Sequence, residues 1–137
     1  MYKLSYQQQA YKRINVETAN PGRVLITLYD ALIKFTRQGI EQIEKRDIGG
    51  KGISLGRAYA IIAEFIHALD YEKAPELCNN LEMIYNFWLE QIAEANNTID
   101  AQRLKPILSQ IESMRQTWSE AVNKATIESA SAAGDQR

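Results

Sequence analysis

The chain has 137 residues, of which 45% are hydrophobic and 24% are charged, so it has the size and composition of one globular domain with a real core. Its formal net charge of −1 argues against nucleic acid or an anionic membrane as the main partner, because both select a surplus of basic residues. The single cysteine, Cys78, excludes an internal disulfide bond. No apolar run reaches the about 20 residues of a membrane span, and none near the start resembles a signal peptide. We therefore expect a cytoplasmic protein without membrane insertion.

The first predicted elements are an arm and a long helix. Residues 1–19 are polar and rich in tyrosine and glutamine, so we expect a loose N-terminal arm. Asn20 is a suitable N-cap because its side-chain oxygen can accept from a free N–H of the first turn, and Pro21 suits the first helical position. Apolar residues at helical spacing extend this helix to about Arg46. The glycines among residues 47–52 are expected to end it in a turn.

Three further segments with helical periodicity follow. Their predicted ranges are residues 54–70, 75–97 and 100–124. Pro106 lies late for a first turn, so it should kink the last helix or delay its start. Residues 126–137 lack apolar periodicity and are expected to form a flexible tail. Short connections make neighbouring helices antiparallel, so the predicted fold is all-α: an antiparallel up-down four-helix bundle over residues 20–125.

No set of residues with catalytic or metal-binding spacing emerges. Glu64 and His67 have the Glu-x-x-His spacing of di-iron helix bundles, but such sites need two histidines and this chain has one. The glycines around Lys51 lack the order and the preceding strand of a phosphate-binding loop. Cys78 has no base predicted within reach, which a nucleophile would need. We therefore expect no enzyme, no metal and no cofactor.

The second and third predicted helices have wider apolar faces than the about three positions in seven that a bundle helix needs. Two interpretations are open: these helices are more deeply buried, or part of their surface lines a groove for an apolar helix or an extended tail. Candidates for partner contact are Ile61, Phe65, Tyr85 and Leu89, with Tyr11 of the arm. Candidates for the core are Ile62, Ile66, Ile84 and Trp88.

An ordered set of short motifs resembles the flagellin export chaperones, the FliS family. The family pattern at the first long helix is Thr-Ala-Ser-Pro, then an aliphatic stretch, then Leu-Tyr. The matching residues here are Thr18, Ala19, Asn20, Pro21, Leu28 and Tyr29. Residues 61–65, 81–87 and 118–121 are similar to later motifs of the family, and Tyr11 falls where the family often has tyrosine.

The resemblance implies a cytoplasmic chaperone that binds the disordered C-terminal segment of flagellin, prevents premature polymerisation and keeps the subunit ready for flagellar type III export. It also admits export-gate components of the flagellar secretion apparatus as partners. The alternative from another class is a structural or regulatory helical bundle that forms a homodimer through its surplus apolar surface. The sequence leaves the oligomeric state and the identity of the flagellin open.

Overall fold

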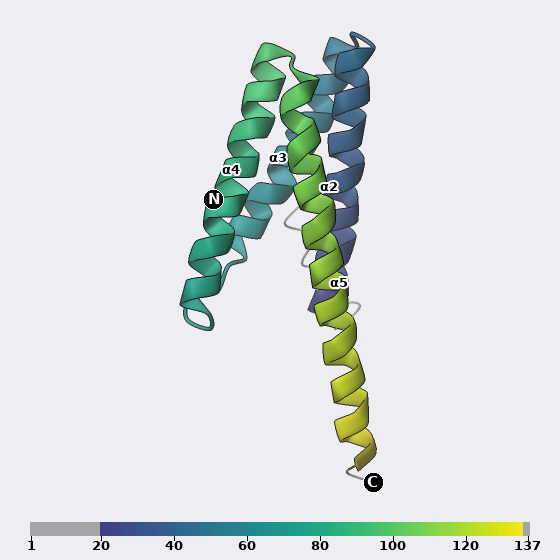
Figure 1. Ribbon diagram of the computed structural model, residues 1–137, viewed down its shortest axis with the longest axis vertical. Helices are drawn as coiled ribbons and strands as arrows, with labels where there is room; N and C mark the ends of the chain where they lie inside the picture. The colour runs from purple at the N-terminus through teal and green to yellow at the C-terminus, as the bar shows by residue number, and fades with distance from the viewer. Residues whose placement is uncertain (1–19, 136–137) are drawn as a thin grey trace, which may run out of the picture.

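The computed structural model describes residues 20–135, whose helices run alternately up and down (Figure 1). The elements are α2 (Pro21–Glu44), α3 (Ile48–His67), α4 (Pro75–Thr98), the short 3-10 helix η1 (Ala101–Arg103) and α5 (Leu104–Asp135). No strand occurs within this range. The predicted all-α four-helix bundle is confirmed. The predicted arm, with Tyr11, Thr18 and Ala19, lies outside the described residues.

The start of α2 follows from its first residues as the sequence predicts. The side-chain oxygen of Asn20 accepts a hydrogen bond from the backbone N–H of Arg23 at 3.3 Å, and Pro21 is the first helical residue. The cap satisfies one of the N–H groups that have no partner within the helix, and proline has no such group to satisfy. Residues 20 and 21 of the family-like motif therefore set where the bundle begins.

The start of α3 differs from the prediction. The glycine-rich segment expected to form a turn belongs to the helix, which begins at Ile48 instead of near Ser54. Asp47 caps this helix by accepting from the N–H of Gly50 at 3.0 Å, and Leu55 is fully buried. Each glycine disfavours a helix by about 1 kcal/mol relative to alanine, so the cap and the tertiary packing outweigh the local propensity here.

The last helix starts late, as one reading of Pro106 predicts. Asp100 caps η1 by accepting from the N–H of Gln102 at 3.0 Å, and α5 begins at Leu104. Pro106 therefore lies in the first turn of α5, where its missing N–H costs no helical hydrogen bond. The helix continues to Asp135, beyond the end predicted near residue 124. The backbone of residues 126–135 is thus helical, and the flexibility of residues 126–137 stays a prediction.

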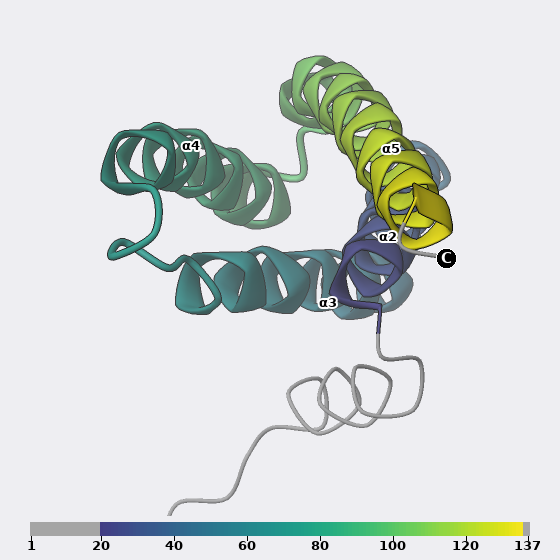
Figure 2. The same ribbon diagram turned by 90° about the horizontal axis from the view of Figure 1, so that it is seen from below.

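The helices pack unequally around the core. α2 packs on both α3 and α5, and α3 packs on α4, whereas α4 and α5 approach each other mainly near η1 (Figures 1 and 2). From there α4 and α5 diverge, and α5 projects beyond the other helices. The largest fully buried side chains include Leu32, Leu55, Ile62, Trp88, Ile92, Leu104, Ile107 and Ile111. The α4–α5 side is therefore the least closed side of the bundle.

Candidate functional site

A groove lies where α4 and α5 diverge. It has a volume of ≈ 550 Å³ and is lined by Ile84, Trp88, Ser109, Gln110, Ser113, Met114 and Thr117. We call it the α4–α5 groove. The indole N–H of Trp88 donates to the side-chain oxygen of Gln110 at 2.9 Å, which links the two walls. Apart from that bond, the α4 wall offers hydrocarbon and the α5 wall offers Met114 with small hydroxyl side chains. Such a surface suits an apolar partner that needs few polar contacts.

Apolar side chains extend from this groove along α4. Leu77, Ile84 and Trp88 follow one another at spacings of seven and four, so they share one face of the helix. Leu77 is exposed, as are Met83 and Phe87 on the adjoining face. Large apolar side chains gathered beside a groove are typical of interaction surfaces. The first half of α4 therefore presents apolar surface that none of the described helices covers.

Three of the side chains predicted to contact a partner lie in the core of the free protein. Ile61, Phe65 and Tyr85 are buried, and Leu89 is half-buried against the core. The ring of Phe65 stacks on Tyr29 with ring centroids 4.7 Å apart and lies 5.4 Å from the ring of Tyr85. They do not line the groove. Their contact with a partner stays a prediction, and it would require the helices to move apart.

The side chains predicted for the core differ in how deeply they are buried. Ile62 and Trp88 are fully buried, while Ile66 and Ile84 are partly exposed. Trp88 and Ile84 also line the α4–α5 groove. Two residues that the sequence analysis assigned to the core, Ile84 and Trp88, therefore form the α4 wall of the groove. Sequence reasoning missed the α5 wall, although Met114 follows the apolar Ile111 at helical spacing.

A hydrogen-bonded aromatic cluster lies behind the groove. The indole N–H of Trp118 donates to the Tyr29 hydroxyl at 3.2 Å, and the Tyr29 and Tyr85 hydroxyls are 3.1 Å apart. Burial is the main cause that raises the pKa of both Tyr29 and Tyr85, because an apolar environment disfavours the phenolate. The motif residue Tyr29 thus serves the core, where it joins α2 to α4 and α5.

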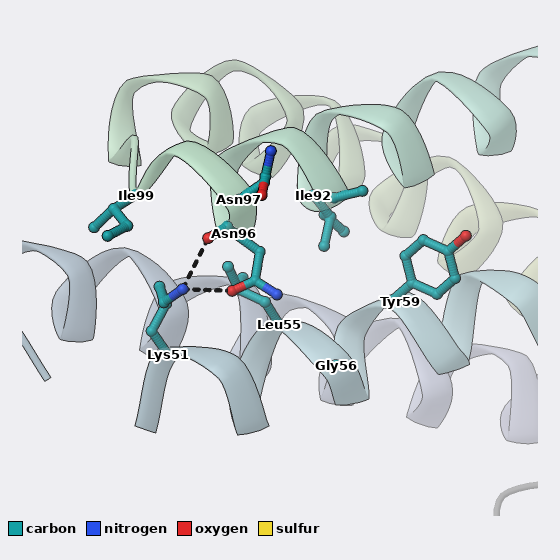
Figure 3. A pocket seen from close by; sticks show the side chains of 9 residues that line it. Lys51, Leu55, Gly56, Tyr59, Ile92, Asn96, Asn97 and Ile99 are labelled. Carbon is teal, nitrogen blue, oxygen red and sulfur yellow. Dashed lines mark hydrogen bonds between the residues drawn. The ribbon is translucent and has the colours of Figure 1, made fainter. Parts of the chain in front are cut away.

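A second concave surface lies on the other side of α4, against α3 (Figure 3). This α3–α4 pocket has a volume of ≈ 510 Å³ and is lined by Lys51, Leu55, Gly56, Tyr59, Ile92, Ala93, Asn96, Asn97 and Ile99. Lys51 Nζ donates to the backbone oxygen of Asn96 at 2.8 Å and to its side-chain oxygen at 2.6 Å. This pocket was not predicted from the sequence, because Lys51 was placed in a turn.

Two of the residues considered for chemistry, His67 and Cys78, flank the connection between α3 and α4. His67 is exposed at the end of α3, and Cys78 is buried, with its thiol donating to the backbone oxygen of Asp70 at 3.3 Å. Within residues 20–135, no group of three or more His, Cys, Asp or Glu side chains could hold a metal ion. Among those same residues, none of the helices combines the length and the apolarity needed to cross a bilayer.

Comparisons with known proteins identify relatives of this chain. The model of the family described as flagellar protein FliS matches residues 2–125. A flagellar secretion chaperone FliS of Vibrio cholerae is 30% identical over 114 residues, which cover 80% of this chain and 84% of that protein. A flagellar secretion chaperone FliSB of Pseudomonas aeruginosa is 29% identical over 122 residues, covering 86% and 96%. The FliS of Salmonella typhimurium is 26% identical over 125 residues, covering 88% and 93%. This chain belongs to the FliS family of flagellar secretion chaperones.

Proposed function

We propose that this protein binds the disordered C-terminal segment of flagellin in the cytoplasm, prevents its premature polymerisation and keeps it ready for type III export. Membership of a flagellar secretion chaperone family supports an exported flagellar subunit as the partner. The α4–α5 groove is the observation that carries the proposal, because its apolar wall is formed by α4, the helix that also exposes Leu77 and Phe87. A flagellin segment that packs against other subunits in the filament carries apolar side chains, and these would aggregate if left free.

The length of the groove bears on how the segment would bind. Its α5 wall runs from Ser109 to Thr117, which is about 12 Å of helix at 1.5 Å per residue. That distance holds about two turns of a bound helix. A longer segment therefore continues onto the exposed apolar face of α4. Ordering it costs about 2–5 kcal/mol of the gross interaction, which keeps the affinity moderate enough for release to export-gate components.

Titration calorimetry with a peptide of the flagellin C-terminal segment tests the proposal. Ser113 is exposed and lines the groove, so Ser113→Trp should fill it and weaken binding by roughly tenfold or more. Asn123→Trp adds the same side chain at an exposed position of α5 outside the groove, so it should bind like the unaltered protein. If the unaltered protein does not bind the peptide, the function is wrong. Equal binding by both variants would instead place the segment elsewhere.

The same samples distinguish a peptide-binding chaperone from the alternative, a helical bundle that forms a homodimer. Light scattering during size-exclusion chromatography gives the mass of the free protein and of the mixture with peptide. We expect a complex whose mass increases by that of the bound peptide. A free protein that is dimeric, and whose dimer is lost in Phe87→Glu without any effect of the peptide, would support self-association through the exposed face of α4.

A further inference from the structure

Lys51 is a buried cation without an acidic partner among residues 20–135. Only 6% of its surface is exposed. None of the ion pairs found within the described part of the chain includes it. Its two acceptors are uncharged oxygens of a single residue, Asn96. Burying a charge is costly unless an opposite charge or full hydrogen bonding compensates it. The ammonium group of Lys51 therefore needs more compensation than these two hydrogen bonds provide.

Part of the explanation is structural. Asn96 lies in the last turn of α4, where the carbonyl groups carry a partial negative charge, and a lysine there stabilises the helix end. Lys51 thereby fastens the start of α3 to the end of α4. The helix end supplies only about half a unit of negative charge, and two acceptors use two of the three N–H donors of the ammonium group. About half of the positive charge and one N–H donor of the ammonium group therefore remain without compensation.

The pocket beside Lys51 supplies room for the missing acceptor. Figure 3 shows the ammonium group at one end of the pocket, with Leu55 and Ile92 along its length and Ile99 close by. The side-chain amide of Asn96, which accepts from the ammonium group, is the polar group nearest to that end. A carboxylate matches the charge and the donor, and an apolar side chain next to it matches the remaining walls.

We propose that the α3–α4 pocket binds a carboxylate of the export substrate together with an adjacent apolar side chain, and that Lys51 recognises the charge. The inference rests on the proposed function and adds a second contact region to it. The pocket and the α4–α5 groove lie on opposite sides of α4. A segment that occupies both therefore passes around α4. The chain-terminal carboxylate and an aspartate or glutamate side chain share this chemistry.

A cycle of protein and peptide changes tests the inference. Lys51→Met removes the ammonium group and keeps an aliphatic chain, while Arg57→Met removes one exposed cation from the same helix outside the pocket. Loss of one charge-assisted hydrogen bond predicts about tenfold weaker binding of the flagellin C-terminal peptide by Lys51→Met than by Arg57→Met. If the carboxylate is the chain terminus, a C-terminally amidated peptide shows the same loss with the unaltered protein and none with Lys51→Met. If the carboxylate belongs to a side chain, replacing that Asp or Glu of the peptide by Asn or Gln should give the same pattern: weaker binding to the unaltered protein and no further loss with Lys51→Met.

A second pair of variants leaves Lys51 in place. Gly56 lines the pocket, and a Cβ atom there meets nothing within 4 Å, so Gly56→Leu should add an apolar side chain at the pocket wall without a clash at its Cβ. Gly49→Leu is the control, since its Cβ is equally free and the residue does not line the pocket. We expect weaker peptide binding only for Gly56→Leu. Equal binding by both members of each pair, or a loss in Lys51→Met that no peptide change reproduces, would overturn the inference. No binding of any peptide by the unaltered protein would overturn the proposed function with it.

Discussion

The hydroxyl groups of Tyr29 and Tyr85 meet 3.1 Å apart inside the bundle. Because Trp118 also donates to the Tyr29 hydroxyl, one oxygen atom connects α2, α4 and α5. The two tyrosines are not equivalent in this arrangement. Tyr29 has two partners, whereas Tyr85 has one.

This asymmetry predicts unequal costs for two similar substitutions. Tyr29→Phe leaves both the Trp118 N–H and the Tyr85 hydroxyl without that partner, so it should lower the unfolding free energy by about 1–3 kcal/mol. Tyr85→Phe leaves the Trp118 bond intact and should cost about 0.5–1.5 kcal/mol. Urea unfolding monitored by circular dichroism measures both values. A larger loss in Tyr85→Phe would contradict the network.

The same pair predicts lower stability at alkaline pH. Burial raises the pKa of both phenols in the folded state, so the native protein holds these protons more tightly than the unfolded chain. The stabilisation is complete below the unfolded pKa of about 10 and is lost as the pH rises above it. The unfolding free energy should therefore fall as the pH rises above about 10, less steeply in Tyr29→Phe. Tyr59→Phe, at an exposed position, should keep the steep fall.

Phe65→Ala distinguishes a core residue from a binding residue. Phe65 is 5% exposed and stacks on Tyr29, so its truncation should lower the unfolding free energy by about 3–5 kcal/mol. Phe87→Ala truncates an exposed phenylalanine beside the groove and should change stability by less than about 0.5 kcal/mol while weakening peptide binding. The sequence placed Phe65 among the binding residues. Weaker binding with an unchanged thermal midpoint in Phe65→Ala would restore that placement.

Gly39 marks the close approach of α2 to α3. A Cβ atom at this position would overlap the side chain of Leu55, which is itself fully buried and has little room to shift. Gly39→Ala should therefore lower the unfolding free energy by about 1–3 kcal/mol in spite of its better helix propensity. Gly52→Ala meets no atom within 4 Å and should raise stability by about 0.5–1 kcal/mol. Thermal unfolding of both variants gives the comparison, and a stabilised Gly39→Ala would refute the close packing.

The N-terminal arm is expected to lie over part of the groove. Tyr2, Leu4, Tyr6 and Tyr11 are amphipathic or apolar residues on a segment too polar to fold alone. A cover lowers the apparent affinity by the fraction of time that the site is open. Deleting residues 2–10 should therefore tighten binding of the flagellin peptide and increase self-association of the free protein. Unchanged affinity in calorimetry would mean that the arm does not cover the site, and weaker binding would mean that it holds the substrate.

Local signals at helix ends account for what the sequence predicted well. Asn20 with Pro21 set the start of α2, and Asp100 with Pro106 set the delayed start of α5, because caps and prolines act within one turn. The predicted start of α3 was wrong because its local signals point away from the observed helix. Its glycines oppose a helix locally, and contacts of Lys51 and other buried residues with distant segments decide the outcome.

The division between core and groove could not be derived from periodicity. α3 is apolar around most of its circumference, so periodicity does not indicate which of its apolar faces is buried in the core. Which stripe of α4 is covered depends on where α4 and α5 diverge, and that is set by packing over the whole bundle. Ile84 therefore lines the groove, and Phe65 lies in the core, although the sequence alone placed them the other way round.

The glycine-rich first half of α3 has a consequence for hydrogen exchange. Its helical state depends on the Asp47 cap and on the bond from Lys51 to the end of α4 more than on its own propensity. Backbone amides between Gly49 and Gly56 are therefore expected to open by local fluctuation well below the global unfolding free energy. A carboxylate held by Lys51 binds only the closed form and makes that opening rarer. Slower exchange confined to this stretch would thus report an occupied α3–α4 pocket from the backbone, without any label on the bound peptide.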